Sequence, residues 1–214
     1  MHKRHSPFDA AHLYTIQTRE RRMLDMLKGL GIQNLHSMRI LDIGCGNGFW
    51  INEFIKWGAD PSNITGVDVD PRCVETAIKN TAKTVTLHCA NGSSLPAEDN
   101  SYDIVLQSTL FTSVLDTDTR TRIAAEMMRV LDHKGFILWY DFHVNNPNNP
   151  GVRRVSRSEV RRLFPSCHVT LKPITLAPPL ARLIAPWSVT LCHILEVFRP
   201  LCTHYIGCIR KISQ

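Results

Sequence analysis

One stretch decides the fold: Ile40-Leu41-Asp42-Ile43-Gly44-Cys45-Gly46-Asn47-Gly48-Phe49. Glycine is required where the backbone takes a positive φ or lies directly against a ligand, because it has no Cβ. Three glycines in five residues, after an apolar run, predict a strand that turns tightly into a helix around a small molecule. The dinucleotide fingerprint requires its third glycine at position 49, which is Phe49 here. The pattern therefore indicates a nucleoside-like ligand rather than NAD, and an NAD-dependent oxidoreductase is the disfavoured alternative.

Length and composition predict one globular α/β domain. The chain has 214 residues, 43% of them hydrophobic, and no apolar run reaches the roughly 18 residues that span a bilayer. Residues 1–7 are charged without an apolar segment behind them, so we expect no secretory signal. The seven cysteines are scattered without a Cys-x-x-Cys pair, which argues against a zinc site or a disulfide framework. We therefore expect a cytoplasmic protein without a metal.

The net charge of +6 leaves two interpretations open. Many of the excess cations are late in the chain, at Arg153, Arg154, Arg157, Arg161, Arg162 and Arg182. They form either a solvated basic face or a surface for an anionic substrate or a membrane. Nucleic acid is disfavoured as a partner, because no aromatic residues interleave with these arginines.

Strands and helices alternate along the first two thirds of the chain. The pattern predicts helices at 11–30, 48–57, 71–81 and 118–131, and strands at 39–42, 63–69, 85–89, 102–107 and 136–141. Such alternation requires a parallel sheet with helices on both faces. Right-handed crossovers place the loops after the strands on one edge, where ligands bind. The glycine loop, Asp68, Asn91, Gln107 and Asp141 fall on that edge.

The last third is less regular. We expect a loop at 145–150, a short helix at 157–164 and strands at 168–176 and 203–212. Between those strands lies an apolar, proline-punctuated helical insert at 177–200. Three roles remain open for it: core packing, the interface of a homodimer, or a lid over an apolar substrate. A lid combined with the arginines would suit an amphipathic or lipid-linked anionic acceptor.

Three polar residues near strand ends predict the details of the ligand site. Asp68 lies 20 residues beyond Gly48, where an acid accepts hydrogen bonds from both ribose hydroxyls of a nucleoside. Asp70 precedes Pro71 and is the better helix cap. Asp42 ends a buried strand, so its carboxylate needs a partner, either backbone N–H groups of the glycine turn or a ligand ammonium. The Asn91 side-chain carbonyl suits an adenine amine, although Asn91-Gly92 is also an ordinary turn sequence.

Together these motifs resemble the class I methyltransferases that use S-adenosylmethionine. The resemblance covers residues 39–141 and includes Met128-Arg129-Val130-Leu131-Asp132-His133-Lys134-Gly135, similar to the family's lead into strand five. It implies a Rossmann-like α/β fold with a seven-stranded mixed sheet whose last strand is antiparallel, and S-adenosyl-L-methionine as cofactor. It also implies that the cofactor contacts Asp42, Gly44, Cys45, Gly46, Gly48, Asp68, Val69, Asn91, Gly92 and Gln107. In that scheme the glycines and Asp42 hold the methionine part, and Asn91 stands where the family usually has an aspartate.

The same resemblance implies a single methyltransferase domain over residues 1–214. A helical cap at 1–37 precedes a cofactor-binding core at 38–141 and a substrate-side region at 142–214. The sequence 139–142 and the segment 176–182 resemble a bacterial subgroup linked to polysaccharide, glycolipid or secondary-metabolite pathways.

Methyl transfer from a sulfonium mainly needs positioning and exclusion of water. An oxygen nucleophile also needs a base, and Asp141 and His143 are the candidates beyond strand five. Each has a plainer alternative, a structural acid or a solvated histidine. We expect O-methylation of a small-molecule, sugar or lipid-linked acceptor, with peripheral membrane contact and a homodimer as open possibilities. The alternatives are a protein or RNA methyltransferase and a non-catalytic S-adenosylmethionine-binding accessory protein.

Overall fold

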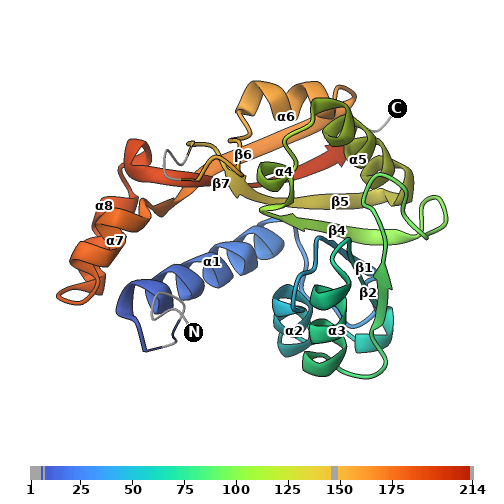
Figure 1. The fold of residues 1–214 in the computed structure, drawn as a ribbon, viewed down its shortest axis with the longest axis horizontal. Coiled ribbons are helices and arrows are strands. Elements are labelled where there is room, and N and C mark those ends of the chain that lie inside the picture. The colour runs from blue at the N-terminus through green and yellow to red at the C-terminus, as the bar shows by residue number, and fades with distance from the viewer. Residues whose placement is uncertain (1–5, 7, 146–148, 213–214) are drawn as a thin grey trace.

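The protein is built around one seven-stranded sheet with the order β3-β2-β1-β4-β5-β7-β6 (Figure 1). The computed structural model describes residues 6, 8–145 and 149–212. The strands are β1 (Ile40–Ile43), β2 (Ile64–Asp68), β3 (Thr86–Cys89), β4 (Tyr102–Ser108), β5 (Leu131–Phe142), β6 (Cys167–Leu176) and β7 (Cys202–Lys211). β7 runs antiparallel to both of its neighbours, β5 and β6, and the other pairs are parallel. The predicted mixed sheet with an antiparallel last strand is confirmed.

Helices cover both faces of this sheet, as the alternating pattern predicted (Figure 1). They are α1 (Ala10–Gly29), α2 (Phe49–Lys56), α3 (Pro71–Asn80), α4 (Leu110–Ser113), α5 (Thr117–Val130), α6 (Arg157–Leu163), α7 (Pro178–Ile184) and α8 (Val189–Glu196), with 3-10 turns η2 (Pro61–Asn63) and η3 (Arg199–Leu201). Alternate residues of β5 divide between two cores: Leu138 and Tyr140 pack on the side of α1 and α2, while Ile137 and Trp139 pack on the side of α5 and α6. This alternation is the period-two geometry of a strand buried on both faces.

Side-chain caps explain why several helices begin where they do. Asp70 accepts a hydrogen bond from Arg72 N at 2.9 Å and Pro71 takes the first turn of α3, as the sequence predicted. Asp9 caps α1 through His12 N, and Asp116 caps α5 through Thr119 N. The helix boundaries of the first two thirds therefore follow from local capping chemistry.

Strand five is longer than the sequence pattern indicated. α5 ends at Val130 and β5 begins at the next residue, so Gly135 lies inside the strand instead of ending the connection before it. A Cβ at Gly135 would lie 2.8 Å from the carbonyl oxygen of Asp103, and this close approach to β4 explains the glycine. The short helix α4 was not predicted. The expectations for residues 1–7 and 145–150 fall partly outside the described residues.

The insert between β6 and β7 is helical, as predicted, and consists of α7, α8 and η3. It lies beyond the ends of β6 and β7, beside the N-terminal half of α1 (Figure 1). Ala11 and Tyr14 of α1 pack there against Ala181 and Cys192. The Tyr14 hydroxyl also donates to the buried Glu196 carboxylate at 3.2 Å. Among the described residues, no helix is long and apolar enough to cross a membrane.

A buried ion pair joins α5 to α6. The Arg120 guanidinium, fully buried, donates to Glu159 Oε1 at 2.6 Å, to Val114 O at 2.7 Å and to Arg153 O at 3.0 Å. One side chain thus satisfies two backbone carbonyls and one carboxylate in three segments. Removing one partner of a buried pair leaves the other groups without hydrogen bonds in a medium of low dielectric constant.

We expect Arg120→Met to lower the free energy of unfolding by about 3–5 kcal/mol, because the buried Glu159 carboxylate and two carbonyl groups lose the hydrogen bonds that Arg120 donates. Arg122→Met is the matched control. Arg122 is exposed on the same helix and, among the described residues, donates to the Thr119 hydroxyl alone, so its loss should cost at most about 1 kcal/mol. Urea unfolding of both variants measures the difference. Equal losses would show that the buried network does not hold these segments.

Candidate cofactor and acceptor site

A cavity of about 400 Å³ opens at the carboxyl edge of β1, β2, β3 and β4. This is the edge on which the sequence placed the ligand. Five predicted cofactor residues line the cavity: Gly44, Asp68, Val69, Asn91 and Gly92. Sequence reasoning missed its other walls, which are Ala90, Ser108, Thr109, Leu110, Ser113, Val114, Thr119 and Ile123, with Ile43 and Val67 from the strands. Most of these missed residues lie on or beside α4 and α5, whose approach to the cavity has no local signature.

The glycine loop has the backbone that its sequence predicted. Gly44, Gly46 and Gly48 take φ values of 75°, 55° and 83°. A Cβ at Gly48 would lie 2.6 Å from Thr81 Cγ2, and one at Gly44 would lie 3.2 Å from Leu110 Cδ1. The glycines therefore serve both the left-handed turn and the close approach of neighbouring segments.

Asp68 lines the cavity and also orders the loop beside it. Its Oδ2 accepts a hydrogen bond from Gly46 N at 2.8 Å, and its Oδ1 accepts one from Asp70 N at 2.9 Å. A carboxylate has about four lone-pair sites, so two bonds leave acceptor capacity for ligand hydroxyls. The position suits the predicted ribose contact, which stays a prediction.

Asp42 is the most unusual residue of the site. It is 1% exposed, and neither carboxylate oxygen has a hydrogen-bond partner among the described residues. Burial, together with the nearby Asp68 charge, raises the Asp42 pKa to about 7. The glycine-turn amides are bonded elsewhere: Gly44 N and Cys45 N donate to Val67 O. Of the two partners that the sequence left open, backbone amides are therefore wrong, and a ligand ammonium remains.

Three other predicted cofactor residues have structural contacts. Asn91 Oδ1 accepts hydrogen bonds from Ser93 N and Ser93 Oγ, both at 2.9 Å, so the adenine contact would compete with this turn. Gln107 is fully buried and accepts from Leu110 N at 3.2 Å, bracing the turn after β4. Cys45 is buried behind the loop, where desolvation raises its thiol pKa. Of the ten predicted cofactor residues, the five that do not line the cavity are Asp42, Cys45, Gly46, Gly48 and Gln107.

Asp141 and His143, the two candidate bases, have very different surroundings. Asp141 is fully buried, and its carboxylate accepts hydrogen bonds from the Thr112 hydroxyl, from Thr112 N at 3.2 Å and from Phe142 N at 2.8 Å. Burial raises the Asp141 pKa to about 7 despite these bonds. This geometry ties the end of β5 to α4. It matches the structural alternative for Asp141.

His143 has a buried ring nitrogen without a hydrogen-bond partner among the described residues. This nitrogen is Nε2, and the ring stacks on Tyr205 with centroids 4.2 Å apart. Burial lowers the His143 pKa, and the nearby charges of Arg154 and Arg157 lower it further. The imidazole is therefore neutral near pH 7 and can accept a proton.

A buried cation from α1 lies on the same face as Tyr140. The Arg19 guanidinium lies 4.7 Å from the Phe49 ring centroid, 4.8 Å from that of Trp50 and 5.6 Å from that of Tyr140. Its Nε has no hydrogen-bond partner among the described residues, and burial lowers its pKa. Aromatic faces surround the charge, and the Glu20 and Glu53 carboxylates interact with it without a direct ion pair among the described residues. Arg19 is thus a further functional candidate, beside the start of α2.

Comparisons with known proteins find similarity over part of the chain. Residues 40–135 match the family model of a methyltransferase domain. The chain is 29% identical over 115 residues to a demethylmenaquinone methyltransferase of Staphylococcus aureus, covering 53% of this chain and 46% of that protein. The chain spans about half the length of the curated relatives it matches.

Solved structures share the fold at low sequence identity. An S-adenosylmethionine-dependent methyltransferase from Methanosarcina mazei superposes with a TM-score of 0.59 at 17% identity, covering 84% of this chain and 94% of that one. The [4+2]-cyclase SpnF superposes with a TM-score of 0.67 at 17% identity, covering 92% of this chain and 83% of that one. At such identities the likeness concerns the fold.

The methyltransferase domain and its fold imply S-adenosylmethionine as the cofactor. The residues present fit this group. The unpartnered Asp42 carboxylate suits an ammonium, and the Asp68 carboxylate at the cavity suits hydroxyl groups. A buried acid without a partner is costly unless a ligand supplies one, so the Asp42 carboxyl group suits a ligand group that donates hydrogen bonds, such as an ammonium.

The raised pKa of Asp42 predicts a pH-dependent affinity. Only the carboxylate attracts an ammonium, so the affinity for S-adenosylhomocysteine should rise about tenfold from about pH 6 to about pH 8, as Asp42 loses its proton. Calorimetry of the wild type and of Asp42→Asn measures this. The variant should bind more weakly at pH 8, with a pH dependence much flatter than that of the wild type.

The same variant separates this role from a structural one. A raised folded pKa means that the ligand-free protein loses stability as pH rises from about 4 to about 7, because the folded state binds the proton more tightly. Ligand-free Asp42→Asn should therefore unfold at a higher temperature than the wild type at pH 8. A lower unfolding temperature would contradict the unpartnered state of this carboxylate.

Proposed function

We propose that this chain is an S-adenosylmethionine-dependent methyltransferase acting on an oxygen of a small-molecule, sugar or lipid-linked acceptor. The observation that carries the donor assignment is the unpartnered, buried Asp42 carboxylate behind a positive-φ glycine loop. The match of residues 40–135 to a methyltransferase domain supports it. The name of the demethylmenaquinone methyltransferase relative supports methyl transfer without identifying the acceptor.

The protein's part in this reaction is positioning and proton removal. The bound cofactor supplies an electrophilic methyl group. The glycine loop and Asp42 hold one end of the cofactor, and Asp68 holds the ribose. Val69, 68% exposed at the cavity wall, offers an apolar surface for the adenine ring of the cofactor. A cavity that excludes water protects the electrophile until the acceptor arrives.

We assign the proton-accepting role to His143. Its neutral imidazole and unpartnered Nε2 meet the requirements of a base, whereas the Asp141 oxygens already accept three hydrogen bonds. Asp141 then acts as a positioning residue, which holds α4 against the end of β5. Arg154 and Arg157, whose charges act on His143, favour an acceptor that carries negative charge nearby.

A second candidate is a cofactor-binding protein without methyl transfer. The superposition with a [4+2]-cyclase favours keeping it, because this fold also occurs in a protein named for another reaction. Incubation with labelled S-adenosylmethionine and metabolite or lipid extracts, followed by mass spectrometry, distinguishes the two. Labelled product supports the proposal, while cofactor binding without label transfer to any extract favours the second candidate.

We expect His143→Gln to lower kcat about 10²- to 10⁴-fold, because the acceptor oxygen loses its base. The affinity for S-adenosylhomocysteine should stay within about twofold, since His143 does not line the cofactor cavity. Asp141→Asn should lower both kcat and the unfolding temperature, because it disturbs the α4 contact. The pH–rate profile decides the assignment: a wild-type acid limb that persists unchanged in His143→Gln would exclude His143 as the base.

A further inference from the structure

The positive charge of this protein is concentrated in its last third. Residues 143–214 contain ten lysines and arginines against two acids, Glu159 and Glu196, a net charge of +8 compared with +6 for the whole chain. Both acids are buried and bonded within the protein, Glu159 to Arg120 and Glu196 to Tyr14. The described surface of this region therefore displays cations without exposed carboxylates.

The same region displays the main exposed apolar side chains. Seven of the fifteen large exposed hydrophobic residues among the described residues lie in the insert: Leu183, Trp187, Val189, Leu191, Ile194, Val197 and Phe198. Soluble surfaces rarely gather apolar side chains in this way unless they meet another apolar surface. We call this set, together with the exposed Arg182 and Arg199, the insert face.

The insert face is a consequence of helix geometry. Leu191, Ile194 and Val197 follow one another at intervals of three residues and are 43%, 53% and 74% exposed. Cys192 and Glu196, on the opposite side of α8, are buried toward α1. Trp187 lies in the turn between α7 and α8 and is 89% exposed. The insert is therefore an amphipathic unit whose inner side is packed and whose outer side is apolar.

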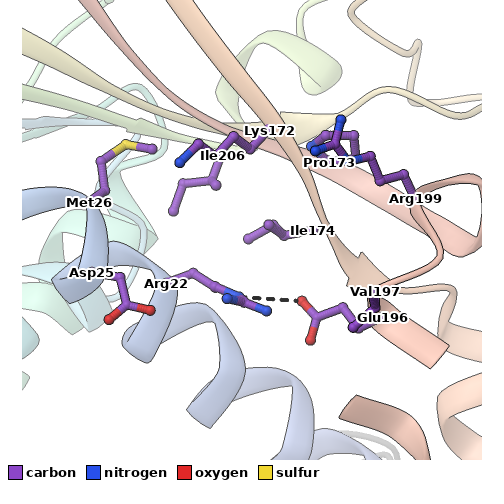
Figure 2. A pocket seen from close by; sticks show the side chains of 10 residues that line it. All are labelled: Arg22, Asp25, Met26, Lys172, Pro173, Ile174, Glu196, Val197, Arg199 and Ile206. Carbon is purple, nitrogen blue, oxygen red and sulfur yellow. Dashed lines mark ion pairs between the residues drawn. The ribbon is translucent and has the colours of Figure 1, made fainter. Parts of the chain in front are cut away.

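A cationic cavity lies at the base of this face. It encloses about 300 Å³, and Arg22 of α1, Lys172 of β6 and Arg199 of η3 line it, together with Val197 of the insert face (Figure 2). Two acids also line it, Asp25 and Glu196, and Glu196 is 3.8 Å from Arg22 Nε. Figure 2 shows the side chains of Arg22 and Glu196 directed toward each other. Lys172 and Arg199 are exposed and form no ion pair within the part of the chain that the structure describes, so they remain available to an anion.

We propose that the insert face docks on the surface of an anionic lipid bilayer. Apolar side chains flanked by cations, on a region whose own described acids are both buried, match the interface between acyl chains and anionic headgroups, and Asp25 of α1 is the one exposed acid that lines the adjoining cavity. A second copy of the chain is a poorer occupant, because it would bring two regions of net charge +8 together. Lys172 and Arg199 contact headgroup phosphates, while Trp187, Ile194 and Leu183 enter the apolar layer.

This inference deepens the proposed function and rests on it for the acceptor alone. A methyltransferase held at a bilayer receives a lipid-linked acceptor without that acceptor leaving the membrane. Lipid contact does not require methyl transfer, so vesicle binding and S-adenosylhomocysteine binding test the two proposals separately. If the protein binds S-adenosylhomocysteine but not vesicles, only the docking proposal is contradicted.

The test uses the full chain and vesicles of phosphatidylcholine, with or without phosphatidylglycerol. Co-sedimentation should show binding that requires the anionic lipid and weakens at high salt. Trp187 is the only exposed tryptophan of four, since Trp50 and Trp139 are buried and Trp57 is partly buried. Its fluorescence emission should shift to the blue on binding, and Trp187→Phe should abolish the shift.

Matched variants separate docking from general surface effects. The double change Leu183→Ser and Ile194→Ser should weaken vesicle binding at least about tenfold. Its control is Ile78→Ser, because Ile78 is 59% exposed on α3, far from the insert (Figure 1). Lys172→Gln with Arg199→Gln should weaken binding about fivefold or more per charge, whereas Arg161→Gln with Arg162→Gln, exposed on α6, should not.

The outcomes are decisive in either direction. Anionic-lipid binding that the insert variants lose and the control variants keep supports the proposal. Binding that all variants retain, or equal binding to neutral vesicles, overturns it. Concentration-dependent dimers that Leu183→Ser and Ile194→Ser abolish, without vesicle binding, would assign the insert face to self-association. All variants should bind S-adenosylhomocysteine like the wild type, which shows that they fold.

Discussion

The hydrogen bond from Gly46 N to Asp68 Oδ2, 2.8 Å long, joins the ends of β1 and β2. It forms because Gly46 takes a positive φ, which turns its N–H toward the neighbouring strand. Gly44 N and Cys45 N donate to Val67 O of the same strand, at 2.7 and 3.1 Å. The loop thus uses its amides to hold β2, and the direct consequence is that none of them reaches Asp42. The Asp42 carboxyl group is therefore left buried, without a partner in the described part of the chain, which suits a cationic ligand group.

That arrangement reduces the stability of the ligand-free protein in exchange for binding. An unpaired carboxyl group that is 1% exposed holds its proton more tightly than a solvated one, and its pKa is raised to about 7. The surroundings do not relieve it, because Asp68 adds a second negative charge nearby. Local rules of folding are broken in this way mainly where a ligand restores them. Arg19 of α1 is a second charged group without a direct ion pair among the described residues, and its guanidinium lies against the Phe49 and Trp50 rings just beyond the same loop.

Much of the fold and of the glycine loop could be predicted from the sequence, because the decisive signals are local. The positive-φ glycines, the Asp70 cap and the alternation of strands and helices all act within a few residues. The hydrogen bonds that hold Asp141 could not be predicted. They depend on Thr112, which lies in a four-residue helix that follows Thr109 at φ 59°. A helix this short has no periodicity. Asn91 was ambiguous for a similar reason: its own turn, through Ser93, competes with any ligand.

Helix α1 connects the two surfaces that matter for function. Tyr14 bonds to Glu196 beneath the insert face, and Arg19 stacks on Phe49, Trp50 and Tyr140 near the cofactor loop. Five residues along an α-helix amount to about 7.5 Å, so the two contacts lie on one rigid segment. Burial of the Tyr14–Glu196 pair makes that junction costly to separate, since each group would lose its hydrogen bond in a dry environment. Any displacement of α7 and α8 against the sheet must therefore move Tyr14, and with it the Arg19 guanidinium that lies over the start of α2.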